Sequence, residues 1–92
     1  MTATDVVVRD EGEGAYTARV ASHDGATVVT LVLGEAPALT GGALAADAAT
    51  AAATIGFLLT HQDAADLPSP VEIGDVLAAY PDAVEQILAR LP

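Results

Sequence analysis

The chain of 92 residues contains no cysteine and no lysine. Without cysteine it cannot form a disulfide, a thiolate zinc site, a thiol nucleophile or a cysteine-ligated iron–sulfur cluster. The absence of cysteine suits a reducing compartment, and the first residues lack the basic and apolar segments of a signal peptide, so we expect a cytoplasmic protein. The longest apolar stretch, residues 51–59, is too short to span a bilayer.

Basic residues are scarce, with three arginines against 13 acidic residues and a formal net charge of −10. Phosphate backbones and anionic lipid surfaces are bound by clustered lysine or arginine, so we expect neither nucleic acid nor membrane partners. An acidic surface would complement a basic protein. The same composition also arises in GC-rich genomes and in salt-adapted proteomes. The acidity therefore has two explanations, namely binding of a basic partner or the general composition of such proteins.

Motifs that carry chemistry are also missing. The chain has no nucleophile elbow, phosphate-binding loop, dinucleotide-binding glycine motif or HExxH sequence. Ser22 is adjacent to His23, but neighbours on a strand point to opposite faces. Ser69 is explained as a helix cap. We therefore expect no enzyme and no cofactor.

The residues present in the first half favour strands. Runs rich in valine and threonine, at Thr4–Arg9, Ala15–Ser22 and Thr27–Leu33, predict a three-stranded antiparallel meander. Asp24-Gly25 is typical of a two-residue hairpin turn.

This turn predicts a register for the meander. It pairs Val20 with Val29 and Tyr16 with Leu33, and a loop at residues 11–13 pairs Val8 with Tyr16. One face then points into the core. The outward face of the second and third strands carries Thr17, Arg19, Ala21, Val28, Thr30 and Val32.

The second half favours helices. We expect a first helix over Ala43–Gln62, because alanine is the best helix former. Ser69-Pro70-Val71-Glu72 resembles a capping box and predicts a second helix to about Ala79. Tyr80-Pro81 should end or kink it before a last segment to Leu91.

The predicted fold is therefore α+β, with helices packed on one face of the meander in the order β-β-β-α-α-α. We expect one domain, residues 1–92, with the meander at 4–34 and the helical part at 43–91. In the first helix we predict one buried stripe and one more polar stripe. The buried stripe is Leu44, Ala48, Ala51, Ile55 and Leu58, and the polar stripe is Asp47, Thr50, Thr54, Phe57 and His61.

Two candidate sites follow. The outward sheet face, with Thr17, Arg19, Val28, Thr30 and Val32, has enough apolar content to bind a protein partner or a second copy. Alternatively, His61, Asp63 and Asp66 could bind a small ligand or a divalent metal, although their spacing matches no known ligand motif.

Part of the chain resembles a known family. Gly14–Val20 is a tyrosine-bearing strand after an acidic, glycine-containing turn, and an alanine-rich helix leads later into Leu67-Pro68-Ser69-Pro70. These features resemble the HicB-like antitoxin domain, from which the residue 37–42 linker and the C-terminal helices depart. The stretch from Phe57 to Tyr80 is similar to small uncharacterised actinobacterial proteins, a likeness that implies no activity. The leading hypothesis is a non-catalytic protein-interaction module, antitoxin-like or immunity-like.

Overall fold

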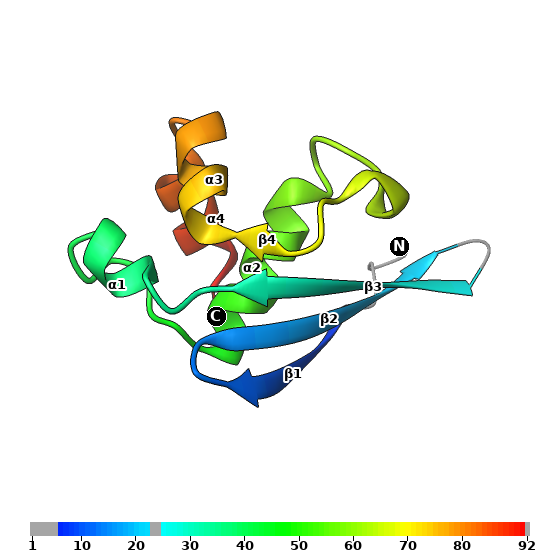
Figure 1. Ribbon diagram of the computed structural model, residues 1–92. Coiled ribbons are helices and arrows are strands. Elements are labelled where there is room, and N and C mark those ends of the chain that lie inside the picture. Colours follow the sequence, from blue (N-terminus) through cyan, green and yellow to red (C-terminus); the bar gives the residue numbers. More distant parts are fainter. Residues whose placement is uncertain (1–5, 23–24, 92) are drawn as a thin grey trace.

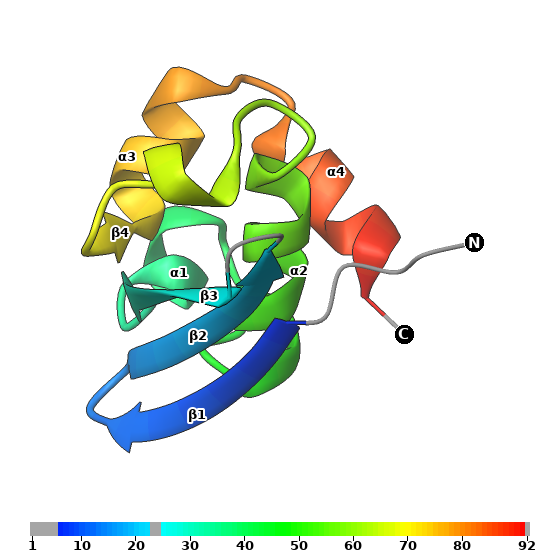
Figure 2. The same ribbon diagram turned by 90° about the vertical axis from the view of Figure 1, so that its right-hand side faces the viewer.

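The first half of the chain, in which apolar and polar residues alternate, forms three antiparallel strands: β1 (Val6–Gly12), β2 (Ala15–Ser22) and β3 (Gly25–Val32). The computed structural model describes residues 6–22 and 25–91, and β2 lies between β1 and β3 (Figure 1). Alternate side chains of β2 and β3 are buried, as expected for a sheet covered on one face only. These buried side chains are Tyr16, Ala18, Val20, Val29 and Leu31. The helices lie on that one side of the sheet (Figure 2).

The meander has the predicted strand order, but both hairpin registers differ by two residues from the prediction. Tyr16 pairs with Leu31 and Val20 with Thr27, while Val8 pairs with Ala18. An even shift keeps each side chain on its predicted face, because the strand period is two. The core and outward faces of β2 and β3 are therefore as predicted. The Asp24 half of the predicted Asp24-Gly25 turn, and residues 4 and 5 of the first predicted strand, lie outside the described residues.

The turn of the first hairpin has two residues in place of the predicted three, because β1 continues to Gly12 and β2 begins at Ala15. Glu13 and Gly14 form the turn, and both have positive φ, at 56° and 80°. Positive φ at both central residues is what a type I′ turn needs. The register shifts between Asp10 and Gly12, and the Gly12 amide donates to the Asp10 carboxylate at 2.7 Å.

A fourth strand, β4 (Val71–Glu72), was not predicted. It pairs in parallel with β3, placing Val71 beside Leu31, and extends the sheet in the order β1-β2-β3-β4. The capping-box prediction for Ser69 is therefore wrong, since Ser69 Oγ accepts a hydrogen bond from the Thr30 amide at 3.2 Å. The edge of β3 needs partners for its backbone groups, and the segment before α3 supplies them.

The helical half begins with a short helix, α1 (Ala36–Leu39), inside the segment predicted as a linker. The next helix, α2 (Ala48–Leu58), is shorter than the predicted Ala43–Gln62 helix. It starts after Asp47, whose side chain accepts from the Thr50 amide at 2.8 Å and caps the helix.

Helix α2 is buried on more sides than the sequence predicts. Ala51, Ile55 and Leu58 are buried as expected, whereas Ala48 is exposed. The predicted polar stripe is also wrong, because Thr50, Thr54 and Phe57 are buried. The other buried side chain of α2 is Ala53. The Thr54 hydroxyl donates to the Thr50 carbonyl oxygen at 2.7 Å, which removes the cost of burying it.

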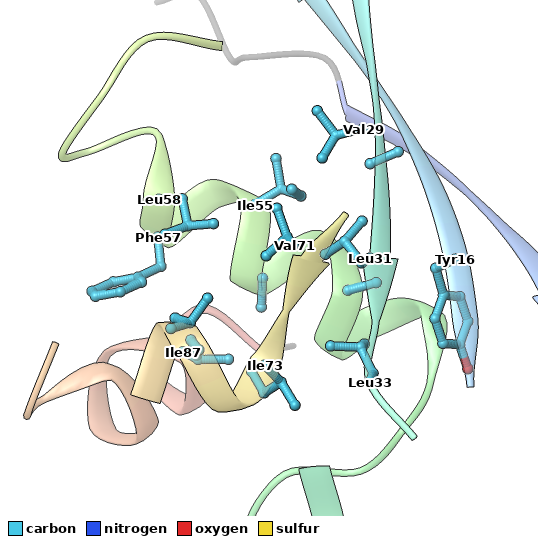
Figure 3. Packing of buried hydrophobic residues seen from close by; sticks show 14 of the residues in the cluster. Tyr16, Val29, Leu31, Leu33, Ile55, Phe57, Leu58, Val71, Ile73 and Ile87 are labelled. Carbon is cyan, nitrogen blue, oxygen red and sulfur yellow. The ribbon is translucent and has the colours of Figure 1, made fainter. Parts of the chain in front are cut away.

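Two separate helices end the fold: α3 (Ile73–Ala79) and α4 (Ala83–Arg90). Tyr80 is extended, with φ −126° and ψ 102°, so the Tyr80-Pro81 pair separates two helices and does not kink one. Helix α2 packs against β1 and β2, α4 packs against α2, and α3 packs against β4. Their buried side chains form one core, in which Ile55, Val71 and Leu31 lie close together (Figure 3). No helix within residues 6–22 and 25–91 is both long and apolar enough to cross a membrane.

Candidate protein interface

The sheet face opposite the helices carries a row of three neighbouring side chains, Val7, Arg19 and Val28. Arg19 pairs with Val7 on one side and with Val28 on the other. The two valines are 65% and 58% exposed, the largest exposures among the large hydrophobic residues described. Arg19 is exposed as well. The row crosses the three long strands and presents apolar surface on both sides of one guanidinium.

The remaining predicted contact residues surround this row. Thr17 pairs with Arg9 and with Thr30, so these three side chains form the adjacent row. Val32 is half-buried and lies one row further, beside Glu72 of β4. The structure thus brings together all five residues predicted for this face. We call Val7, Arg9, Thr17, Arg19, Val28, Thr30 and Val32 the open face.

The open face differs in charge from the rest of the chain. Arg9 and Arg19 are two of only three arginines, and the cross-strand neighbours of both are valine or threonine. Of the acidic residues of the first hairpin, Asp10 and Glu11 lie at the end of β1 and Glu13 lies in the turn, while Glu72 of β4 pairs with Val32. The positive patch of the open face therefore consists of Arg19 on the inner strand β2 and Arg9 on the edge strand β1, in a chain of net charge −10.

A groove lies on the helical side of the molecule, between β1, α2 and α4. Its volume is about 680 Å³, it opens to solvent, and it is lined by Val6, Ala49, Ala52, Ala53, Gly56, Leu59, Thr60 and Arg90. The Arg90 side chain lies over Gly56, 3.7 Å from the position that a Cβ on Gly56 would take. The lining offers one guanidinium and one hydroxyl, so it contains no acid–base pair and no nucleophile–base pair.

The structure does not bring His61, Asp63 and Asp66 together as a metal-binding group. The His61 ring stacks on Tyr80, with centroids 4.5 Å apart, and meets Phe57 edge-on at 5.0 Å. Within the described part of the chain, no group of three or more His, Cys, Asp or Glu side chains could hold a metal ion. His61 thus caps the hydrophobic core as an aromatic side chain.

Tyr16 is buried, and its phenol has a structural role. Its hydroxyl donates to the Ala46 carbonyl oxygen at 2.8 Å, which connects β2 to the segment before α2. Burial raises the pKa of the Tyr16 phenol, and the charges of Asp10 and Asp47 raise it further. The neutral phenol is therefore the form that the fold favours.

Sequence reasoning did not include Val7 among the contact residues. The signal was present, because the predicted pairing of Val8 with Tyr16 places Val8 on the core face and hence Val7 on the opposite face. No protein-family model, no curated protein and no solved structure matches this chain.

Proposed function

We propose that this chain is a non-catalytic protein-binding module and that the open face receives the partner. The observation that carries the proposal is the exposure of Val7 and Val28 on both sides of Arg19. Two valines exposed this far, next to each other on a flat sheet, form an apolar surface that gains free energy when another surface covers it.

The size of this gain indicates how large the contact must be. Complete burial of a valine side chain contributes roughly 1.5–3 kcal/mol, so covering what remains exposed of two valines contributes about 2–3 kcal/mol. A micromolar complex needs about 8 kcal/mol. The two valines are thus the centre of a larger contact, which takes in the threonine row and the two arginines of the open face.

The role that we propose for this binding is inhibition or masking of the partner, as in antitoxin or immunity proteins. Such a role needs a surface that the fold holds in shape before the partner arrives, because preorganisation lowers the entropy cost of association. Three hydrogen-bonded strands backed by a buried core satisfy that requirement. The partner need not be basic at the contact itself, since the open face carries arginines and not the acidic residues.

The test compares two apolar side chains of similar exposure. Val28 on the open face is 58% exposed and Leu39 on α1 is 51% exposed. Proteins captured by the tagged chain from its source cells are identified, produced separately and titrated against the purified chain. We expect Val28→Asp to weaken binding of a purified partner at least about tenfold, and Leu39→Asp to change it less than about twofold.

The proposed function also allows a second copy of the chain as the partner. Light scattering measures the molar mass of the wild type and of both variants, and a dimer that Val28→Asp alone dissociates would support the proposal. A chain that stays monomeric and binds no purified candidate, or a partner that Val28→Asp and Leu39→Asp weaken equally, overturns it. Far-ultraviolet circular dichroism of both variants establishes that they remain folded.

A further inference from the structure

The position of Arg19 restricts what can cover the open face. Its guanidinium is at the centre of the face, and its cross-strand neighbours Val7 and Val28 are apolar. Any partner that covers the valines also removes water from Arg19. A charge that loses its water without gaining a partner costs free energy, so the covering surface must supply an acceptor there.

A second copy of the chain is a poor supplier of that acceptor. A two-fold interface places the same patch on both sides, so each copy would bring Arg9 and Arg19 to the contact and no carboxylate from the open face. Like charges facing each other in an interface oppose association. The net charge of −10 on each copy adds long-range repulsion.

A carboxylate is the acceptor that fits best. The planar guanidinium donates two parallel hydrogen bonds to one carboxylate, a geometry that lysine cannot match. The two valines would exclude water from this pair and so strengthen it. A nucleic-acid backbone also offers anionic oxygens, but it offers no apolar groups to cover the valines, and the charge of −10 opposes it.

Resting on the proposed function, we infer that the partner is a different protein whose contact surface carries a carboxylate between apolar side chains, placed to pair with Arg19. Arg9, one row away on the same face, extends the positive patch and favours a second acidic residue on the partner. The chain is acidic as a whole, but its open face carries arginines and would therefore bind an acidic surface of the partner.

The probe is a displayed library of random dodecapeptides selected on the immobilised wild-type chain. The most enriched peptide is then synthesised in two forms, one as selected and one with every carboxylate replaced by the corresponding amide. Both forms are titrated against the wild type, Arg19→Gln, Val28→Asp and Arg90→Gln. Arg90 is the matched control, because it is the one arginine outside the open face and lies on α4.

We expect the selected peptides to combine acidic and apolar residues. The amide form should bind the wild type and Arg90→Gln about tenfold more weakly than the acidic form. On Arg19→Gln the two forms should differ clearly less than on the wild type, because Arg9 alone is then left on the open face to distinguish them.

The outcomes separate this inference from the proposed function. Peptides that depend on Val28 but contain no excess of acidic residues, or that lose equal affinity on Arg19→Gln and Arg90→Gln, overturn the inference and leave the proposed function standing. Selected peptides that bind Val28→Asp as well as the wild type, or a library that enriches nothing, count against the open face itself. A wild-type chain that dimerises through the open face also overturns the inference, because the occupant is then a second copy.

Discussion

Gly14 is the position where a single methyl group should do the most damage to this fold. Its φ is +80°, and a Cβ built on it would lie 2.5 Å from the Gly34 Cα atom and 2.7 Å from the Gly34 nitrogen. Both neighbouring atoms are backbone, so neither can turn aside as the end of a side chain could. The Gly14 carbonyl also accepts a hydrogen bond from the Leu33 amide at 2.8 Å, which holds the two segments together. Gly14→Ala must therefore separate the first hairpin from the end of β3.

The expected cost has two parts. Placing a residue with a Cβ at positive φ costs roughly 1–2 kcal/mol. Inserting a methyl group where the backbone must shift costs typically about 1–3 kcal/mol more. Together they predict a loss of about 2–5 kcal/mol in the free energy of unfolding, a large part of the 5–15 kcal/mol that roughly describes small domains.

Gly12 is the matched control within the same turn. Its φ is +90°, but nothing lies within 4 Å of the Cβ that an alanine would bring. Gly12→Ala should therefore lose only the conformational part, about 1–2 kcal/mol. The difference between the two variants measures the close approach of Gly14 and Gly34.

Urea unfolding followed by circular dichroism measures both free energies, with the slope against urea checking that each transition keeps the same character. Gly14→Ala should unfold at clearly lower urea than Gly12→Ala. Equal losses in the two variants would refute the contact with Gly34, and a Gly14→Ala loss below about 1 kcal/mol would refute the steric argument as a whole.

Further predictions concern the buried aromatic side chains. Tyr16→Phe should cost about 1–2 kcal/mol in urea unfolding, because it leaves the Ala46 carbonyl without its donor; an unchanged midpoint would contradict the hydrogen bond. The raised pKa of Tyr16 favours the protonated phenol in the fold, so its stabilisation is intact below about pH 10 and falls as the pH rises above it. The wild type should thus lose stability above pH 10 more steeply than Tyr16→Phe, and parallel pH profiles would argue against this assignment. His61→Ala should cost roughly 0.5–1.5 kcal/mol through lost stacking on Tyr80, and zinc should not raise the melting temperature of the wild type; a rise that His61→Ala abolishes would restore the metal hypothesis.

The faces of the sheet could be read from the sequence, whereas the pairing of the strands could not. Tyr16, Ala18 and Val20 alternate with polar residues, and alternation alone assigns each to the core. The registers depend on where each turn closes, and neither hairpin closes where the sequence predicts; in the second hairpin, Gly25 belongs to β3 and pairs with Ser22. The first hairpin closes at Glu13-Gly14, whose two positive φ angles make a turn tighter than the predicted loop.

The helical half was predicted less well because its local signals compete with tertiary contacts. Ser69-Pro70-Val71 has the pattern of a helix start, yet Val71 pairs with β3 and Ser69 binds the Thr30 amide. A strand of two residues is too short to show a periodic pattern in the sequence. It forms because the backbone groups at the edge of β3 need hydrogen-bond partners. Thr54 also has the residue type of a surface position, yet it is buried because its hydroxyl donates to the Thr50 carbonyl oxygen within the helix.

For the candidate interface, the sequence by itself determined which side chains of β2 and β3 point away from the core, because that depends only on the two-residue period of a strand. It also determined the charge of the chain and the scarcity of arginine. Only the tertiary structure decided that Arg19 lies between Val7 and Val28, since these three residues come from three strands and meet through pairing. The side on which the helices pack decided which face of the sheet stays open to a partner. The face that the helices leave uncovered is the one that carries two of the three arginines.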